Sequence, residues 1–461
     1  MNKPAFLKVS NLKKKPICMA PWTNFYAKIT PDGYNAKVCC VNEDSVDVKN
    51  ISEYFESDML KNITSSLEKG ELPNSCRRCE HNPDFESYEN EIQKKKRKRN
   101  IIAHKHDYES LTIDDLKVIL EHDDNKFIQL DLRPSNLCNL KCRMCNSSSS
   151  TEIAKESLKI ISDNDFISDL RETTTSASAL TAFDEKYFKK YAEDYTSNDD
   201  HKNRVREIFK YANLQRLKLL GGEPSIDPAI ISVMKDLKED KIKKSNGFRL
   251  QITTNMTNIN KTWLDYFQVF NAKITASIDG AGRTYEYIRY PAKWNRIESN
   301  IKALTPETGS NDLSMNLVMS NILFLDIKHW IPILNNLALE KSFKLNFIEC
   351  FYPTYMMPSN IPYEYKMKIL EDIKHLKKYD LSSNIRDFLD KSERYLESIA
   401  NEDPDMNNLK AFFLINMKQD KLRKQNIFDI NYTKYIFDIN YTKEIYNKMN
   451  KGANNDRSKQ I

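Results

Sequence analysis

Six short apolar segments recur along the chain, and a segment with helical periodicity follows each of them. The apolar segments are residues 127–133, 214–220, 248–253, 273–279, 314–319 and 344–349. Between them, apolar residues are spaced by three or four positions, as in Ile230, Val233 and Leu237, which is typical of a helix with one buried face. Parallel strands require such crossovers, and the crossovers are right-handed. The pattern therefore predicts an α/β fold with a partial (β/α)6 TIM-like barrel.

The length of the chain predicts more than this barrel. A single hydrophobic core rarely grows beyond about 250–300 residues, and the chain has 461. We expect the barrel at residues 126–380, preceded by a small Cys-rich hairpin domain at 1–93 and a basic linker or helix at 94–125. Strand signals cease after the barrel, so we expect a helical, polar tail at 381–461.

Two stretches interrupt the regular pattern. Residues 163–203 contain TTTSASALTA and YTSNDDHKN, so the first crossover of the barrel is much longer than the others. We interpret this insert as a loosely ordered surface segment, with a lid or a partner-binding insert as the alternative. In the tail, IFDINYTK occurs at 427–434 and again at 436–443, which indicates a local duplication because a solenoid needs at least about three repeats.

The charge balance does not favour a nucleic-acid partner. The 71 basic and 65 acidic residues leave a net charge of only +6. The basic run KKKRKR at 94–99 has no interleaved aromatic residues that could stack on bases, so a solvated helix or linker is the preferred interpretation.

The compartment is predicted from what the sequence does not contain. No apolar run approaches the about 18–20 residues that span a bilayer, and MNKPAFLKVSNLKKK lacks the apolar stretch of a signal peptide. Nine cysteines in a chain this long do not resemble the dense disulfide framework of a small secreted domain. We therefore expect a cytoplasmic protein without a membrane partner, in which clustered thiols serve as metal ligands.

The strongest chemical signal follows the first predicted strand. Cys138, Cys142 and Cys145 are spaced as CxxxCxxC in the stretch FIQLDLRPSNLCNLKCRMC. Three thiolates can hold an iron-sulfur cluster and leave one iron with an open coordination position, although structural zinc sites and redox pairs also cluster thiols.

Other polar motifs follow the next strands. Gly221, Gly222, Glu223 and Pro224 come after the second strand, and Thr253 to Asn255 and Ser277 to Gly280 come after the third and fourth. Active sites of β/α folds lie beyond the carboxyl ends of the strands, so these motifs should converge. Adjacent glycines would let backbone carbonyls approach the amine of a bound ligand, and Glu223 would supply negative charge. The GGEP tetrad is equally consistent with a turn that starts a helix.

A second group of thiols lies near the amino terminus. The turn at Pro31 to Gly33 predicts a β-hairpin, and Cys18, Cys39, Cys40, Cys76 and Cys79 surround it. Four thiolates could hold either a structural zinc or a second iron-sulfur cluster. Only one of Cys39 and Cys40 should be a ligand, because consecutive side chains on a strand point to opposite faces.

Four motifs together resemble the radical S-adenosylmethionine (radical SAM) superfamily over roughly residues 126–360. These are CNLKCRMC, LKLLGGEP, TTN and SIDGAGRTYEYIR. The resemblance implies a 4Fe-4S cluster on Cys138, Cys142 and Cys145, with SAM chelating the open iron. It also implies the residues that bind this cofactor: Gly221, Gly222 and Glu223 at its amino group, Ser277 and Asp279 near its ribose or carboxylate, and also Asn255, Arg289 and the backbone of Met144. Met144 departs from the family, since many members have an aromatic residue there.

The amino-terminal cysteines resemble the SPASM/twitch auxiliary-cluster domains of the same superfamily. This favours a second iron-sulfur cluster over zinc, although in better-known members the domain follows the barrel. The late stretch FFLINMKQDKLRKQNIFDI is similar to the carboxyl-terminal end of twitch proteins.

The resemblance implies an enzyme that cleaves SAM reductively to a 5′-deoxyadenosyl radical and abstracts hydrogen from a substrate. A peptide or protein substrate is the leading hypothesis, with a flavodoxin or ferredoxin as the one-electron reductant. The alternatives are modification of a nucleic acid or a small metabolite, or a non-enzymatic, metal-stabilised binding protein. No catalytic acid or base is predicted. Cys350 could quench a substrate radical or bind metal, but a cysteine after a strand is more often a small buried hydrophobe.

Overall fold

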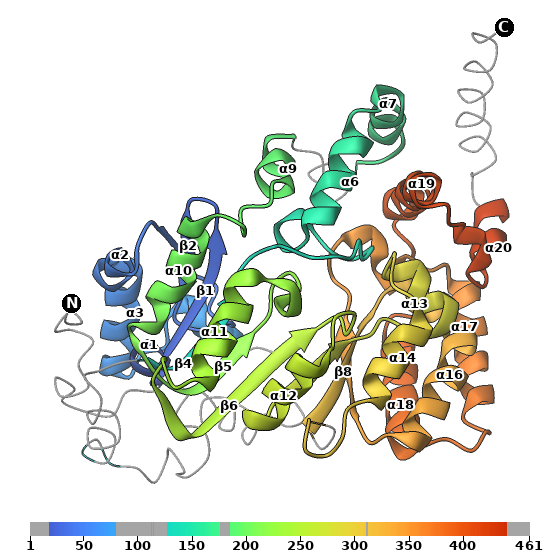
Figure 1. Cartoon of the computed structure of the whole chain (residues 1–461). Helices are drawn as coiled ribbons and strands as arrows, with labels where there is room; N and C mark the ends of the chain where they lie inside the picture. The colour runs from blue at the N-terminus through green and yellow to red at the C-terminus, as the bar shows by residue number, and fades with distance from the viewer. Residues whose placement is uncertain are drawn as a thin grey trace, which may run out of the picture.

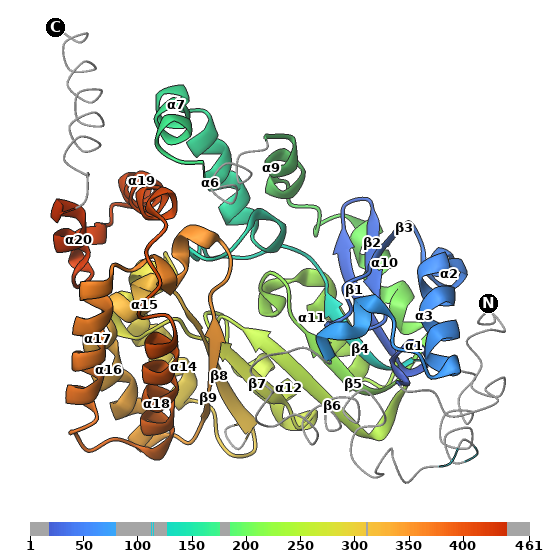
Figure 2. The same ribbon diagram turned by 180° about the vertical axis from the view of Figure 1, so that it is seen from behind.

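The computed structural model of the protein describes residues 18–79, 112, 114, 127–175, 185–309 and 312–439. These residues build one curved sheet in the strand order β3-β2-β1-β4-β5-β6-β7-β8-β9, with helices around it (Figures 1 and 2). Six strands form its parallel part: β4 (Phe127–Arg133), β5 (Ala212–Leu219), β6 (Lys244–Thr254), β7 (Lys273–Ser277), β8 (Leu313–Met319) and β9 (Lys344–Glu349). The predicted partial, open barrel is therefore confirmed.

The predicted hairpin is also present, and it continues the sheet of the barrel. Strands β1 (Asn24–Thr30) and β2 (Gly33–Lys37) are antiparallel, β3 (Val46–Val48) pairs with β2, and β1 runs parallel to β4. Gly33 is needed at the turn because a Cβ there would lie 2.2 Å from the Val48 carbonyl oxygen. The hairpin is thus part of the barrel wall rather than a sheet of its own. The predicted boundary at residue 93 lies outside the described residues.

An aromatic cluster joins the hairpin segment to the barrel. The rings of Phe25 and Phe127 stack with their centres 5.1 Å apart, and Tyr54 and Phe55 pack against them. All four side chains are at most 1% exposed. Burying side chains of this size stabilises a fold by roughly 1.5–3 kcal/mol each, so β1 is held firmly against β4.

Helices cover the convex side of the sheet (Figure 1). Those next to the hairpin are α1 (Ala20–Thr23), α2 (Ile51–Glu56), α3 (Asp58–Lys69) and the 3-10 turn η3 (Asn74–Cys79). Those along the barrel are α10 (Asp199–Phe209), α11 (Pro228–Lys238), α12 (Lys261–Val269), α13 (Gly282–Ile288), α14 (Trp294–Lys302), α15 (Asn321–Leu325), α16 (Ile327–Glu340), α17 (Tyr363–Leu376) and α18 (Ser383–Ser398). The remaining 3-10 turns are η5 (Ser147–Ser149), η7 (Pro224–Ile226), η9 (Thr354–Met356), η10 (Pro358–Asn360) and η11 (Ile427–Asp429).

The concave face of the sheet is polar. On β4, Leu130 and Leu132 are buried in the apolar core, and the alternate residues Asp131 and Arg133 lie on the other face. Polar side chains pair across this face, as Lys218 does with Asp131 at 3.0 Å and Asn346 with Asn316 at 2.8 Å. The barrel therefore surrounds a polar space at its centre.

We expected residues 163–203 to form a loosely ordered surface segment. This prediction is wrong for the described part of the range, which is helical. Helices α6 (Thr151–Ile161), α7 (Asn164–Thr173) and α9 (Glu185–Ala192) stand above the barrel, and α10 closes the crossover. Their starts are encoded locally, since Ser150 caps α6 and Asp163 caps α7 through hydrogen bonds to Ile153 N and Phe166 N. The TTTSASALTA segment falls mainly on residues 176–184, outside the described range.

The predicted tail is helical, and many of its polar residues are buried. Helix α19 (Met406–Arg423) buries both apolar and polar side chains, and α20 (Thr433–Ile439) follows it. Buried polar residues require hydrogen-bond partners, which α19 finds in the barrel. The two IFDINYTK copies contact each other, with the rings of Phe428 and Phe437 4.9 Å apart. The KKKRKR run and residues 440–461 lie outside the described part of the chain.

Within the described residues, no helix is long and apolar enough to cross a membrane.

Candidate functional site

The three cysteines of the CxxxCxxC motif lie at the wall of a cavity of about 770 Å³ on the concave face. The loop that carries them begins where β4 ends and runs to η5. Nearly all the predicted cofactor-binding residues line the same cavity, namely Met144, Gly221, Gly222, Asn255, Ser277, Asp279 and Arg289. The fold therefore brings together motifs that are separated by more than a hundred positions in the sequence.

Backbone hydrogen bonds fix the cysteine loop against the segment after α13. Lys141 N donates to Tyr290 O at 2.7 Å and Arg143 N donates to Ile288 O at 3.0 Å. On the other side, Ser150 Oγ donates to Leu140 O at 2.8 Å. The loop has no regular secondary structure of its own, so these bonds determine where the thiols lie.

The two adjacent glycines allow the cysteine loop to lie against the end of β5. Gly222 N donates to Ser135 O at 3.0 Å and Glu223 N donates to Leu137 O at 2.7 Å. A Cβ at Gly222 would lie 2.2 Å from the Leu137 carbonyl oxygen, and Gly221 has a φ of +118° that disfavours any side chain. Both glycines face the cavity, so they also leave room for a ligand.

Glu223 has a different position from the one expected for a cofactor-binding carboxylate. Its side chain is 1% exposed and does not reach the cavity wall. It accepts hydrogen bonds from Ser225 N, Thr254 Oγ1 and Asn255 N at 3.1, 2.8 and 2.6 Å. Burial raises the pKa of Glu223, while these hydrogen bonds oppose that rise. The structure thus uses Glu223 to join the ends of β5 and β6.

Asn255 connects the end of β6 to the cysteine loop. Its Nδ2 donates to Asn139 Oδ1 at 2.9 Å, and Thr257 Oγ1 donates to its Oδ1 at 2.6 Å. Asn139 in turn donates to Thr257 at 2.9 Å, which closes a small ring of hydrogen bonds beside Cys138. Asn255 also lines the cavity, so it stands between the predicted cluster and the space for a ligand.

Asp279 and Arg289 form an ion pair that reaches a cysteine. The guanidinium donates to Asp279 Oδ2 at 2.9 and 2.7 Å, and Asp279 Oδ1 accepts from Val318 N at 2.8 Å. Arg289 Nη1 lies 3.7 Å from Cys142 Sγ. Burial alone would lower the pKa of Arg289, but Asp279 and Cys142 together raise it. This arginine remains charged and places a positive group at the thiol. Ser277 lies at the end of β7 on the same cavity wall.

The thiols themselves fit an iron-sulfur cluster, whose irons would keep them deprotonated. Burial and the neighbouring thiols raise the pKa of Cys138 well above its usual value and that of Cys145 to about 12, so without a metal they would be neutral. In the described chain no group of three or more Cys, His, Asp or Glu side chains converges on the position of a single ion. A cubane does not require such convergence, because each cysteine binds a different iron.

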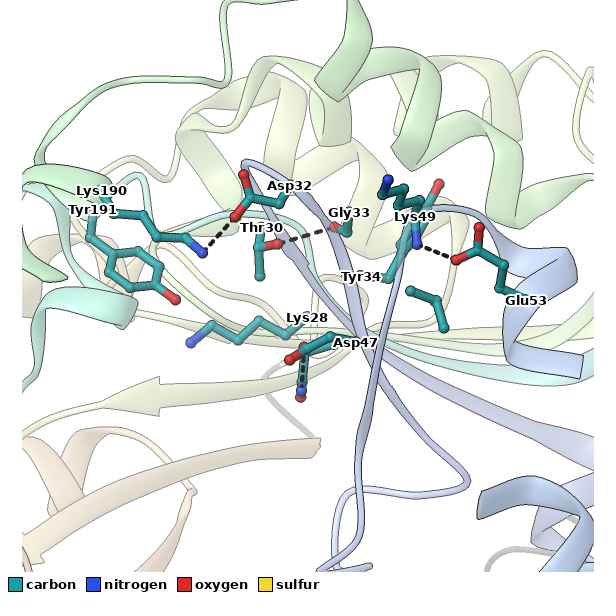
Figure 3. Close-up of a pocket in the computed structure, with 12 residues that line it drawn as sticks. Lys28, Thr30, Asp32, Gly33, Tyr34, Asp47, Lys49, Glu53, Lys190 and Tyr191 are labelled. Carbon is teal, nitrogen blue, oxygen red and sulfur yellow. Dashed lines mark hydrogen bonds and ion pairs between the residues drawn. The ribbon is translucent and has the colours of Figure 1, made fainter. Parts of the chain in front are cut away.

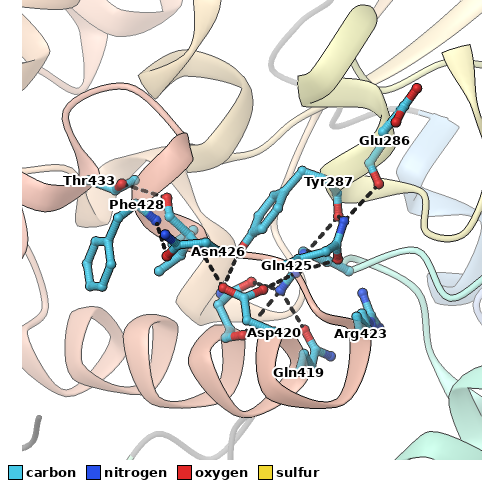
Figure 4. Close-up of polar contacts among 12 residues, drawn as sticks. Glu286, Tyr287, Gln419, Asp420, Arg423, Gln425, Asn426, Phe428 and Thr433 are labelled. Atoms are coloured by element: carbon cyan, nitrogen blue, oxygen red, sulfur yellow. Dashed lines mark hydrogen bonds and ion pairs between the residues drawn. The ribbon is translucent and has the colours of Figure 1, made fainter.

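A buried arginine between the second and third cysteines links the loop to α19. The Arg143 guanidinium donates to Asn416 Oδ1 at 2.7 Å, to Gln419 Oε1 at 3.1 Å and to the Asp420 carboxylate. It also lies 3.7 Å from the centre of the Tyr287 ring. Figure 4 shows how Asp420 is itself fixed, since Tyr287 and the backbone of Ile427 donate to it. The network was not predicted from the sequence, although the resemblance of the FFLINMKQDKLRKQNIFDI stretch to twitch proteins was a signal for it.

A second buried ion pair connects α19 to α6, the helix that follows the cysteine loop. Arg423 donates through two nitrogens to the Glu156 carboxylate of α6, and both side chains are at most 3% exposed. Helix α19 therefore contacts both the cysteine loop and helix α6. Its polar residues are part of the site.

The structure distinguishes Cys39 from Cys40. Cys39 is buried, and Cys18 is close enough to raise its pKa together with burial. Asn42, which donates its backbone N–H to Cys39 O, also donates its side chain to Cys76 Sγ at 3.3 Å. Cys40 is exposed and lies beside Asp131 and Lys218 of the concave face. The side chain of Cys79 lies outside the described residues.

Cys350 is not part of the cavity wall. It is 1% exposed, its thiol lies 3.8 Å from the Tyr352 carbonyl oxygen, and burial raises its pKa to about 12. Its position is that of a small buried hydrophobic residue.

Comparison with known proteins gives the following matches. Residues 132–321 match the model of the Radical SAM superfamily, and no curated protein matches the chain. Similar solved structures include native anSMEcpe with bound AdoMet, at 14% identity over 57% of this chain and 62% of that one, with a TM-score of 0.33. They also include Streptococcus suis SuiB bound to S-adenosylmethionine, at 13% identity over 77% and 69%, with a TM-score of 0.30. Escherichia coli coproporphyrinogen III oxidase (HemN) is similar at 15% identity over 59% and 52%, with a TM-score of 0.28.

The chain spans about three fifths of the length of anSMEcpe. The matched region, residues 132–321, contains the CxxxCxxC loop, the GGEP turn, Asn255, Asp279 and Arg289. Residues 132–321 therefore match a radical SAM domain.

Proposed function

We propose that the protein holds a 4Fe-4S cluster on Cys138, Cys142 and Cys145, cleaves SAM and abstracts a hydrogen atom from a peptide or protein. When bound, the cluster supplies the electron that breaks a carbon–sulfur bond of SAM and yields the 5′-deoxyadenosyl radical. The observation that carries the proposal is the shared cavity of about 770 Å³, which the three thiols line together with Gly221, Gly222, Asn255 and Arg289.

The chain's own residues would bind and orient both partners. Gly222 lets the cysteine loop lie against the end of β5, Asn255 holds that loop through Asn139, and Arg289 keeps a positive charge at Cys142. With cofactor and substrate bound, the filled cavity would keep bulk water from the reacting atoms and so preserve a reactive radical for the substrate. No proton transfer is assigned to any residue.

The polar lining of the cavity supports a peptide over the alternatives. Thr253, Thr275, Asn316 and Asn346 present hydroxyl and amide groups that can pair with peptide N–H and C=O groups. The basic run at 94–99 has no interleaved aromatic residues that could stack on bases, which disfavours a nucleic acid.

We further propose an auxiliary iron-sulfur cluster on Cys18, Cys39, Cys76 and Cys79. The support is that Cys39 lies near Cys18 and that Asn42 connects the Cys39 turn to Cys76. Zinc remains the alternative for these four thiols. A flavodoxin or ferredoxin would supply the electron, and the chemistry requires the reducing conditions of the cytoplasm.

Anaerobic reconstitution with iron and sulfide, followed by dithionite and SAM, tests the main proposal. We expect 5′-deoxyadenosine and methionine by mass spectrometry, no product from Cys142→Ala, and normal product from the matched control Cys350→Ala. A fully loaded cluster that forms no 5′-deoxyadenosine would contradict the enzymatic function and favour a binding protein.

The auxiliary cluster is tested in the variant that lacks Cys138, Cys142 and Cys145. We expect residual iron and sulfide in this triple alanine variant. Zinc in place of residual iron would show that the second site is a structural zinc centre.

A further inference from the structure

A second cavity, of about 620 Å³, lies between the amino-terminal hairpin and the insert (Figure 3). Lys28 of β1 and Asp47 of β3 line it, as do Lys190 and Tyr191 of α9. Lys28 is the direct partner of Arg133 in the β1–β4 pairing, and Arg133 lines the cavity with the three cysteines. Side chains of paired residues share one face of a sheet, so the two cavities adjoin at this pair of cations.

Neither cation has a carboxylate partner among the residues that the structure describes. The Lys28 amine lies 5.5 Å from the centre of the Tyr191 ring, and the Arg133 guanidinium lies 5.7 Å from that of Tyr26. Arg133 Nε is buried without a hydrogen-bond partner.

The acidic groups nearby are already engaged. Lys190 forms an ion pair with Asp32 at 2.6 Å and Lys218 forms one with Asp131 at 3.0 Å. Asn35 donates a hydrogen bond to Asp47 at 2.9 Å. Figure 3 shows the Lys28 side chain extending into the cavity, free of the contacts that join Lys190 to Asp32.

Two like charges in register on neighbouring strands repel each other. Burial and the charge of Arg133 lower the pKa of Lys28 to about 8, and Cys145 acts in the opposite direction. An anion placed between the cations would remove this repulsion and satisfy the buried Arg133 Nε. Arg133 and Cys145 line the same cavity, so such an anion would lie next to the cysteine loop.

We propose that Lys28 and Arg133 together bind a carboxylate of the substrate, so that an acidic residue of a peptide lies beside the cysteine loop. The inference rests on the proposed function and names its substrate class, an acidic peptide. Two other anions could interact with the same pair of cations, namely the carboxylate of SAM and the thiolate-ligated cluster itself. The experiment distinguishes these from a substrate carboxylate.

The test is the binding of fluorescein-labelled hexaglutamate, with hexaglutamine as the uncharged control, to the reconstituted protein with SAM at near-physiological salt. We expect hexaglutamate to bind more tightly than hexaglutamine. Lys28→Gln and Arg133→Gln should each weaken it at least about tenfold, as expected for loss of a hydrogen bond between charged groups. Lys28→Arg should retain binding because it keeps the charge. Lys49→Gln is the matched control, because Lys49 lines the same cavity away from the pair.

Three results would overturn the inference. The first is equal binding of the two peptides. The second is a loss of SAM affinity in both glutamine variants with unchanged peptide binding. The third is a shifted reduction potential of the cluster with unchanged peptide binding. Formation of 5′-deoxyadenosine without substrate is measured separately in each variant, so failure of this inference is distinguishable from failure of the proposed SAM chemistry.

Discussion

Arg143 of the cysteine loop and Asp420 of α19 form a buried ion pair although 277 positions separate them in the sequence. The arginine side chain is fully buried, and the aspartate is 6% exposed. The carboxyl-terminal helix therefore supplies the counter-charge for a residue that stands between two predicted cluster ligands. This pairing makes α19 a structural part of the site.

Removing the counter-charge should destabilise the protein and the cluster. Asp420→Ala leaves the Arg143 guanidinium buried without its carboxylate, so we expect a loss of roughly 3–5 kcal/mol in the free energy of unfolding. Urea denaturation and iron content per chain measure the two effects. Asp429→Ala is the matched control, since Asp429 is exposed on the same segment. If Asp420→Ala had the stability and iron content of wild type, the pair would have no role in holding the loop.

A methyl group at Gly222 should displace the cysteine loop. Its Cβ would lie 2.2 Å from the Leu137 carbonyl oxygen, which cannot move without shifting the backbone next to Cys138. We expect Gly222→Ala to retain less than about a tenth of the wild-type SAM cleavage rate, since small misplacements cost about a hundredfold. Gly247→Ala, where a Cβ meets nothing within 4 Å, should behave like wild type. The rate of 5′-deoxyadenosine formation is measured in both variants and compared with wild type.

The two adjacent cysteines should differ in metal binding. Cys39 is buried near Cys18, whereas Cys40 faces Asp131 and Lys218. We therefore expect Cys39→Ala to lose the auxiliary metal and Cys40→Ala to keep it. Metal analysis of both variants in the background without Cys138, Cys142 and Cys145 isolates this site. Loss of metal from the Cys40 variant alone would reverse the assignment.

The affinity for hexaglutamate should depend on pH through Lys28. Its pKa is lowered to about 8 by burial and by Arg133 of β4 and Lys190 of α9, against the opposing effect of Cys145. The amine is charged below this value and neutral above it, so binding should weaken as the pH rises through about 8. Anisotropy titrations between pH 7 and pH 9 measure the change. In Lys28→Gln the profile should be flat over this range, and a slope identical to that of wild type would exclude Lys28 as the titrating group.

Local sequence patterns were sufficient to predict the barrel. Each strand from β4 to β9 is a short apolar run, and each crossover has helical spacing, so near-neighbour periodicity carries the information. The metal-binding loop was predictable for the same reason, because Cys138, Cys142 and Cys145 lie within eight positions. Polar residues after strands converge in any parallel sheet, which explains why Asn255, Ser277 and Asp279 reach one cavity.

The sequence predicted a helical, polar tail at residues 381–461, but it did not show that polar residues of α19 are buried. Polar residues in a sequence are expected at the surface, and nothing local shows that Asn416, Gln419 and Asp420 have a buried partner. That partner, Arg143, is distant in the chain. The helical insert was missed for a related reason, since its helix α7 is stabilised by contacts with α19, such as the Lys418–Asp163 pair.

The sequence by itself determined the barrel and the cysteine loop, because these depend on residues close together in the chain. Only the tertiary structure decided that α19 neutralises Arg143, that Cys39 and Cys40 face different surroundings, and that Lys28 stands beside Arg133. Each of these relationships depends on strand register or on packing between distant segments. The physical reason is that burial and electrostatic partners are properties of the folded chain, which neighbouring positions in the sequence do not specify.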